Sequence, residues 1–156
     1  MNSTRVEKKS DRELVVTRTF DAPARLVFEA WTTPELFRQW WIPKSMGMVL
    51  QSLEMDARTG GRYRLVFGEG MAFFGRYIEV TPYSKIVWTN EESGDANSVT
   101  TVTLEERGGK TLLVMSDLYP SKEALDAAGT GAADATVETF QQLDELLAPA
   151  PAAGHP

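Results

Sequence analysis

Few residues in this sequence could carry acid–base or nucleophilic chemistry. The chain has no cysteine, and its one histidine, His155, lies in the final Ala/Pro-rich segment. A Ser-His-Asp triad, an imidazole metal site and a thiolate nucleophile are therefore not expected within the folded part of the chain. We predict no catalytic set, no metal site and no cofactor. The groups left for proton transfer are carboxylates and tyrosines, chiefly Asp117, Asp144, Tyr63 and Tyr77.

Asp117 is the most informative of these carboxylates. Counting by twos from Leu113 and Met115 places it on their face of a strand, where burial would raise its pKa. It also stands at the end of that strand, where a solvated or capping carboxylate is the commoner alternative. Both interpretations stay open at the level of sequence.

Length, composition and charge narrow the classes of partner. A chain of 156 residues is most simply one domain, and 42% hydrophobic with 24% charged residues is ordinary for a soluble globular protein. The net charge of −6 and the lack of a Lys/Arg cluster argue against nucleic-acid binding. No apolar run is long enough for a membrane span, and the polar N-terminus does not fit a signal peptide. We therefore expect a cytoplasmic protein.

Hydrophobic spacing and turn residues predict the order of helices and strands. Residues 13–20 are typical of a strand, and two short helices follow, one after an N-cap at Asp21 and one after Thr33. Six further strands with turn residues between them are expected at 48–56, 62–67, 71–80, 85–91, 98–106 and 110–118. Their short connections predict antiparallel hairpins. Residues 121–147 close the chain as a helix, with an interruption expected at Gly129–Gly131.

These elements predict one domain over residues 12–148, between a flexible arm at 1–11 and a flexible tail at 149–156. Alternation in the strand at 62–67 places Tyr63, Leu65 and Phe67 on one face and two arginines on the other. A sheet that is apolar on one face can bury it by curling around the amphipathic last helix. The predicted class is α+β, in the order β-α-α-β6-α.

Several segments, taken in this order, resemble one protein family. They are FDAPARLVFEAWTTPELFRQWW (20–41), DARTGGRYR (56–64), FFGRYIEVTPYSKIVWT (73–89), TVTLEE (101–106), GGKTLL (108–113) and FQQLDELL (140–147). From 15 to 147 the chain resembles the helix-grip, START/Bet v 1-like superfamily, and within it the group named after the C-terminal domain of the activator of the heat-shock protein 90 ATPase. The resemblance implies a curved sheet that grips the last helix, a cavity between them that opens near the two short helices, and a role in the stress response.

The resemblance, with the aromatic and Met content of the inward faces, also predicts the wall of that cavity. The predicted ligand-binding residues are Trp40, Trp41, Met48, Tyr63, Leu65, Met71, Phe73, Tyr77, Trp88, Met115, Phe140 and Asp144. Adjacent residues on a helix point about 100° apart. We therefore expect one residue of the Trp40–Trp41 pair to anchor the short helix and the other to cover the cavity, while the alternative that both belong to the core stays open.

Three functions are compatible with this interpretation. The leading hypothesis is that the cavity binds a small hydrophobic or aromatic ligand. The second is an enzyme of the polyketide cyclase or dehydratase kind, which requires Asp117 or Asp144 to project into the cavity beside Tyr63 or Tyr77. The third is a co-chaperone-like protein that binds a chaperone partner through the sheet surface. A homodimer formed through the open sheet edge or the short helices is left open.

Overall fold

The structure is a computed structural model that describes residues 4–47, 49–68, 72–91 and 97–147. Its elements, in chain order, are β1 (Arg5–Lys8), β2 (Glu13–Phe20), α1 (Ala24–Thr32), α2 (Pro34–Trp40), the short 3-10 helix η1 (Lys44–Met46), β3 (Leu50–Met55), β4 (Arg62–Phe67), β5 (Ala72–Thr81), β6 (Lys85–Asn90), β7 (Ser98–Arg107), β8 (Lys110–Leu118) and α3 (Lys122–Leu147).

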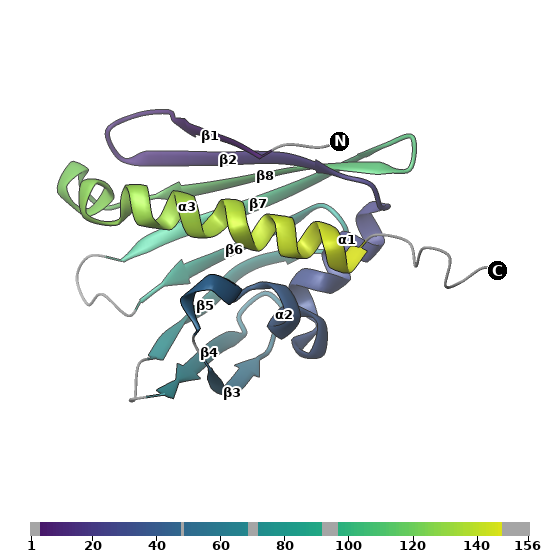
Figure 1. The fold of residues 1–156 in the computed structure, drawn as a ribbon, viewed down its shortest axis with the longest axis horizontal. Coiled ribbons are helices and arrows are strands. Elements are labelled where there is room, and N and C mark those ends of the chain that lie inside the picture. Colours follow the sequence, from purple (N-terminus) through teal and green to yellow (C-terminus); the bar gives the residue numbers. More distant parts are fainter. Residues whose placement is uncertain (1–3, 48, 69–71, 92–96, 148–156) are drawn as a thin grey trace.

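The strands form one sheet in the order β1-β2-β8-β7-β6-β5-β4-β3, and every neighbouring pair is antiparallel. Figure 1 shows α3 laid across one face of this sheet, with α1 and α2 beside its C-terminal half. A sheet with a single apolar face needs such a cover. The predicted α+β class is therefore confirmed, and the arrangement is that of a helix-grip fold.

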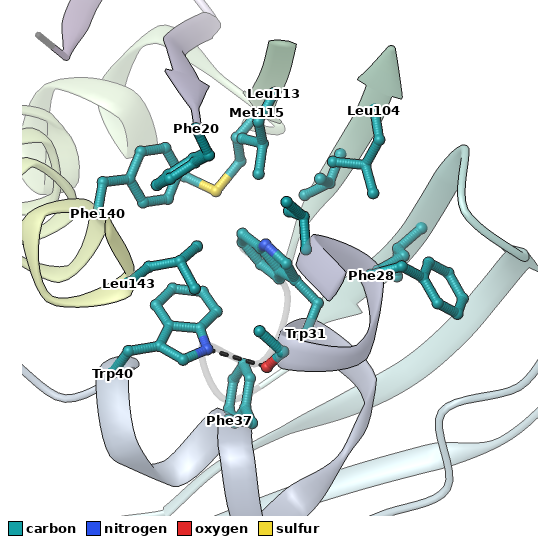
Figure 2. Packing of buried hydrophobic residues seen from close by; sticks show 14 of the residues in the cluster. Phe20, Phe28, Trp31, Phe37, Trp40, Leu104, Leu113, Met115, Phe140 and Leu143 are labelled. Atoms are coloured by element: carbon teal, nitrogen blue, oxygen red, sulfur yellow. Dashed lines mark hydrogen bonds between the residues drawn. The ribbon is translucent and has the colours of Figure 1, made fainter. Parts of the chain in front are cut away.

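The core lies between α3, the two short helices and the β2–β8 part of the sheet. Phe20 of β2 meets Phe140 of α3 edge-on at 5.8 Å between ring centroids. Trp31 of α1 meets Trp40 of α2 in the same way at 4.7 Å. Figure 2 shows these rings packed around Leu143, which is fully buried like Phe20, Trp40 and Phe140. Each ring belongs to a different element, so the two contacts join α3 to the sheet and α1 to α2.

The strand predictions for β2 and β4–β8 agree with the structure to within one residue at each end, and β3 is shorter than its prediction. The N-terminal arm differs, because it contributes β1 at the sheet edge, where Val6 pairs with Val16. All four residues of β1 are exposed. An edge strand of this kind gains backbone hydrogen bonds without burying side chains, so it leaves no hydrophobic pattern to detect.

Two predictions about helix ends and interruptions were wrong. The first helix begins after Pro23 rather than after a cap at Asp21, whose carboxylate lies 3.3 Å from the Lys110 ammonium. The last helix runs unbroken through residues 129–131. A glycine costs a helix about 1 kcal/mol relative to alanine, and buried contacts on both sides of the glycines, at Leu125 and Phe140, offset that cost. Within the described ranges, no helix is both long and apolar enough to cross a membrane.

Candidate ligand-binding site

A cavity of about 590 Å³ lies between the β3–β6 part of the sheet, the two short helices and α3. Nearly half of its lining residues are aromatic: Trp31, Phe37, Trp41, Tyr63, Phe67, Phe73, Tyr77 and Trp88. Aliphatic and sulfur-containing groups complete the apolar part of the lining, at Ile42, Pro43, Met55, Leu65, Ile86 and Ala135. Polar lining groups are Asn90, Thr136 and Thr139, and the described lining includes no charged side chain.

The cavity exists because α3 presents different side chains to the two halves of the sheet. Over β2 and β8 it contributes large groups, such as Phe140 and Leu143, that fill the core. Over the other half it contributes Ala135, Thr136 and Thr139, which lie on one helical face and are small. The sheet curves away beneath them, so the space that larger side chains would occupy stays open.

The two adjacent tryptophans have different positions. Trp40 is 0% exposed, does not line the cavity, and its indole N–H donates to the carbonyl oxygen of Ala30 at 2.9 Å. Figure 2 shows this hydrogen bond between α2 and α1. Trp41 is half-buried, lines the cavity and stacks on Phe37 with 5.0 Å between ring centroids. Of the two roles expected for the pair, Trp40 has the anchoring position and Trp41 the position at the cavity wall.

The segment that follows α2 forms part of the wall and is held by α3. The Gln142 side chain donates to the carbonyl oxygens of Trp40 and Ile42, and its own oxygen accepts from the backbone N–H of Lys44, each at 2.9 Å. One turn earlier, the Glu138 carboxylate accepts from the backbone N–H and the hydroxyl of Ser45. These two bonds hold the pKa of that carboxyl below its usual range.

A chain of polar groups closes the end of the cavity at β6. The Asn90 oxygen accepts from the indole N–H of Trp88 at 3.2 Å and from the Tyr63 hydroxyl at 3.1 Å. The Asn90 amide nitrogen donates to Ser98 and Thr100 at 3.0 and 2.9 Å. The Tyr63 hydroxyl has one proton, which it shares between Asn90 and the carbonyl oxygen of Thr89, so both amide protons and one oxygen position of Asn90 are fully occupied within the protein.

The Tyr63 ring passes over Gly75 to reach this end of the cavity. Its hydroxyl also lies 2.8 Å from the carbonyl oxygen of Thr89. A Cβ at Gly75 would stand 1.9 Å from that same oxygen and 3.0 Å from the Tyr63 ring. Only a residue without a side chain fits between them, so Gly75 permits the close approach of β5 to β6 and to Tyr63.

Neither of the carboxylates considered for catalysis lines the cavity. Asp117 accepts a hydrogen bond from the Thr100 hydroxyl, and burial raises its pKa to about 6, against the opposing effect of that bond. Asp144 faces the other half of the sheet, where it lies 3.1 Å from the buried Arg18 guanidinium. The geometry required by a cyclase-like or dehydratase-like enzyme, a carboxylate projecting into the cavity beside Tyr63 or Tyr77, is absent from the described lining.

The predicted ligand-binding residues divide into those that reach the cavity and those that do not. Lining positions are occupied by Trp41, Tyr63, Leu65, Phe73, Tyr77 and Trp88. The other described positions lie elsewhere, because Trp40, Met115 and Phe140 pack in the filled half of the core and Asp144 pairs with an arginine. Met48 and Met71 lie outside the described residues.

Sequence reasoning missed several lining or supporting residues. Ile86 could have been found, because strand alternation places it on the same face as Trp88, and Met55 lies opposite Tyr63 in the neighbouring strand. Gln142 carried no comparable signal, since a glutamine on an amphipathic helix is usually solvated.

The sequence matches a known protein family, and the fold matches several solved structures. The family model described as "Activator of Hsp90 ATPase homolog 1-like protein" matches residues 21–148. A crystal structure from Rhodobacter sphaeroides is similar, with a TM-score of 0.82, 25% identity and coverage of 93% of this chain and 97% of that chain. A Chromobacterium violaceum structure has a TM-score of 0.77, 28% identity and coverage of 89% and 99%. One from Staphylococcus epidermidis has a TM-score of 0.73, 26% identity and coverage of 91% and 92%. No curated protein matches the sequence.

Proposed function

Because this chain belongs to the family of activator of Hsp90 ATPase homolog 1-like proteins, we propose that it binds a small hydrophobic or aromatic ligand in the cavity between the sheet and α3. The observation that carries the proposal is the lining itself: a volume of about 590 Å³ walled mainly by aromatic and aliphatic side chains, with no charged side chain among the described lining residues. Ligand pockets of about 300–1,000 Å³ with such walls are typical of small-molecule sites.

The physical argument is that such a cavity is a poor place for water. A buried water molecule needs two to four polar partners. Here the Asn90 amide contacts four protein groups and the Thr139 hydroxyl donates to the carbonyl oxygen of Thr136, so among the buried described lining residues the Tyr77 hydroxyl is left as a partner for water. An apolar ligand replaces poorly bound water and gains about 25 cal/mol for each Å² of apolar surface that it buries. The resemblance to START/Bet v 1-like proteins, many of which bind apolar molecules, supports the same proposal.

The proposal can be tested with N-phenyl-1-naphthylamine, an uncharged probe whose emission rises in an apolar site. Three of the four tryptophans line the cavity, so binding should also quench tryptophan fluorescence and raise the melting temperature. The cavity-filling variant Ala135→Phe should lose binding. The matched control Val137→Phe, on an exposed position of the same helix, should retain it. If the wild-type protein shows neither quenching nor a thermal shift, or if Ala135→Phe binds as well as the wild type, the proposal fails.

A further inference from the structure

Tyr77 is a buried residue of the cavity wall that carries a hydroxyl group. Tyr77 lies on the cavity face of β5, opposite Trp88 of β6, and is only 6% exposed. Its ring packs beside Tyr63 with 5.7 Å between centroids. Among the residues that the structure describes, none forms a hydrogen bond with its hydroxyl. Buried hydroxyls are nearly always paired, because leaving one unpaired costs free energy.

Other buried polar groups of the wall are already occupied or cannot be reached. The Asn90 amide contacts four protein groups, one of them through the Tyr63 proton that it shares with Thr89, and the Thr139 hydroxyl donates to its own helix at 3.2 Å. The Trp31 indole N–H has no partner in the described structure, but packing closes its nitrogen off from the cavity space. Among the buried lining residues that the structure describes, Tyr77 is therefore the one whose hydroxyl is open to a bound molecule.

The chemistry of Tyr77 indicates what that molecule would offer. Burial, and secondarily the Asp56 carboxylate, raises the pKa of the Tyr77 phenol above its usual value. The phenol is thus neutral near pH 7 and can donate its proton in a hydrogen bond. Since the described lining has no charged side chain, a charged ligand group would lose its hydration without gaining a counter-ion.

We propose that Tyr77 selects ligands that carry an uncharged acceptor oxygen, a carbonyl or an ether, on an aromatic body. The Tyr77 hydroxyl donates a hydrogen bond to this oxygen, and the surrounding tryptophans and phenylalanines contact the body. This inference rests on the proposed function, because it assigns a ligand class to the same cavity. It gives Tyr77 the role of a specificity-determining residue.

Two probes of nearly the same shape test this assignment. Fluorenone and fluorene are flat three-ring molecules that differ by one carbonyl oxygen. Their affinities would be measured by calorimetric titration for the wild type, for Tyr77→Phe and for the matched control Tyr83→Phe. Tyr83 is 50% exposed and outside the cavity lining. One neutral hydrogen bond should favour fluorenone about 3- to 10-fold in the wild type and in Tyr83→Phe. Tyr77→Phe should lose this preference and bind fluorenone no better than fluorene, because the carbonyl is then desolvated without a donor, with an unchanged affinity for fluorene.

Each other outcome contradicts a specific claim. If the wild type binds both probes equally, or if Tyr77→Phe keeps the preference for fluorenone, the assignment of Tyr77 is wrong while the proposed function stands. If Tyr77→Phe weakens both probes by the same factor, Tyr77 acts by packing and the assignment is also wrong. If the wild type binds neither probe while N-phenyl-1-naphthylamine binds, the ligand class is wrong. Failure of all three probes overturns the proposed function together with this inference.

Discussion

Replacing the two adjacent tryptophans one at a time should separate stability from ligand binding. Trp40 is fully buried, and an aromatic side chain of this kind removes about 150–250 Å² from water. At about 25 cal/mol per Å², Trp40→Ala should therefore lower the free energy of unfolding by about 4–6 kcal/mol. The change also leaves the carbonyl oxygen of Ala30 without the indole donor that lies 2.9 Å away. Such a loss is a large share of the stability of a small domain.

Trp41→Ala should lose less stability than Trp40→Ala and should in addition weaken ligand binding. Trp41 is half-buried and lines the cavity, so about half of the same area is involved and the loss of stability should be about 2–3 kcal/mol. Removing this part of the wall takes away about 50 Å² of ligand contact, or about 1.3 kcal/mol, which corresponds to about tenfold weaker binding.

The assays are urea unfolding for stability and the emission of N-phenyl-1-naphthylamine for affinity, since the probe signal does not depend on the mutated tryptophan itself. Trp40→Phe serves as a milder variant if Trp40→Ala does not fold, and it should bind the probe within about threefold of the wild type. The reasoning is refuted if Trp41→Ala leaves affinity unchanged, or if the Trp40 variants lose affinity without losing stability.

Three further predictions concern residues around the cavity. Gly75→Ala should destabilise the protein by about 3 kcal/mol or more in urea unfolding, because its Cβ would stand 1.9 Å from the Thr89 oxygen. Gly68→Ala is the control, since a Cβ there meets nothing closer than 3.7 Å. Equal losses of stability in the two variants would contradict this reasoning. Gln142→Ala should cost about 2–4 kcal/mol and speed hydrogen exchange at residues 40–45, because three hydrogen bonds to that segment disappear. The exposed Glu145→Ala on the same helix should do neither, and unchanged exchange in Gln142→Ala would contradict the role given to Gln142. Burial raises the pKa of Asp117 from 3.8 to about 6, so the folded state binds this proton more tightly than the unfolded state. The free energy of unfolding of the wild type should then fall as pH rises from about 4 to 6, by up to about 3 kcal/mol relative to Asp117→Asn. If the difference in unfolding free energy between the wild type and Asp117→Asn does not change with pH, Asp117 is not a buried carboxyl.

Local sequence patterns predicted most of the fold because they reflect local physics. Alternation at 62–67 and the Thr33–Pro34 start signal correspond to β4 and α2 as the structure has them. The β1 strand was not predictable in this way, since an exposed edge strand has no buried face. The unbroken α3 was not either, because the buried contacts that offset the glycines come from strands distant in sequence.

The cavity wall was harder to predict than the fold for a related reason. An inward-facing aromatic residue looks the same in sequence whether it meets a neighbour or an open space. Phe140 and Met115 face the filled half of the core, while Trp88 and Tyr77 face the hollow half. The difference depends on small residues of α3, such as Ala135, that face only one half of the sheet. That relation appears only when the register between helix and sheet is known.

The central claim, that the space between the sheet and α3 is a ligand site, is tested most directly by a crystal structure of the protein with N-phenyl-1-naphthylamine. The account predicts density for the probe inside the cavity, in contact with Trp41, Tyr77 and Trp88 and with little displacement of α3. Density for the probe only on the outer face of the sheet, with side chains collapsed into the cavity, would contradict it.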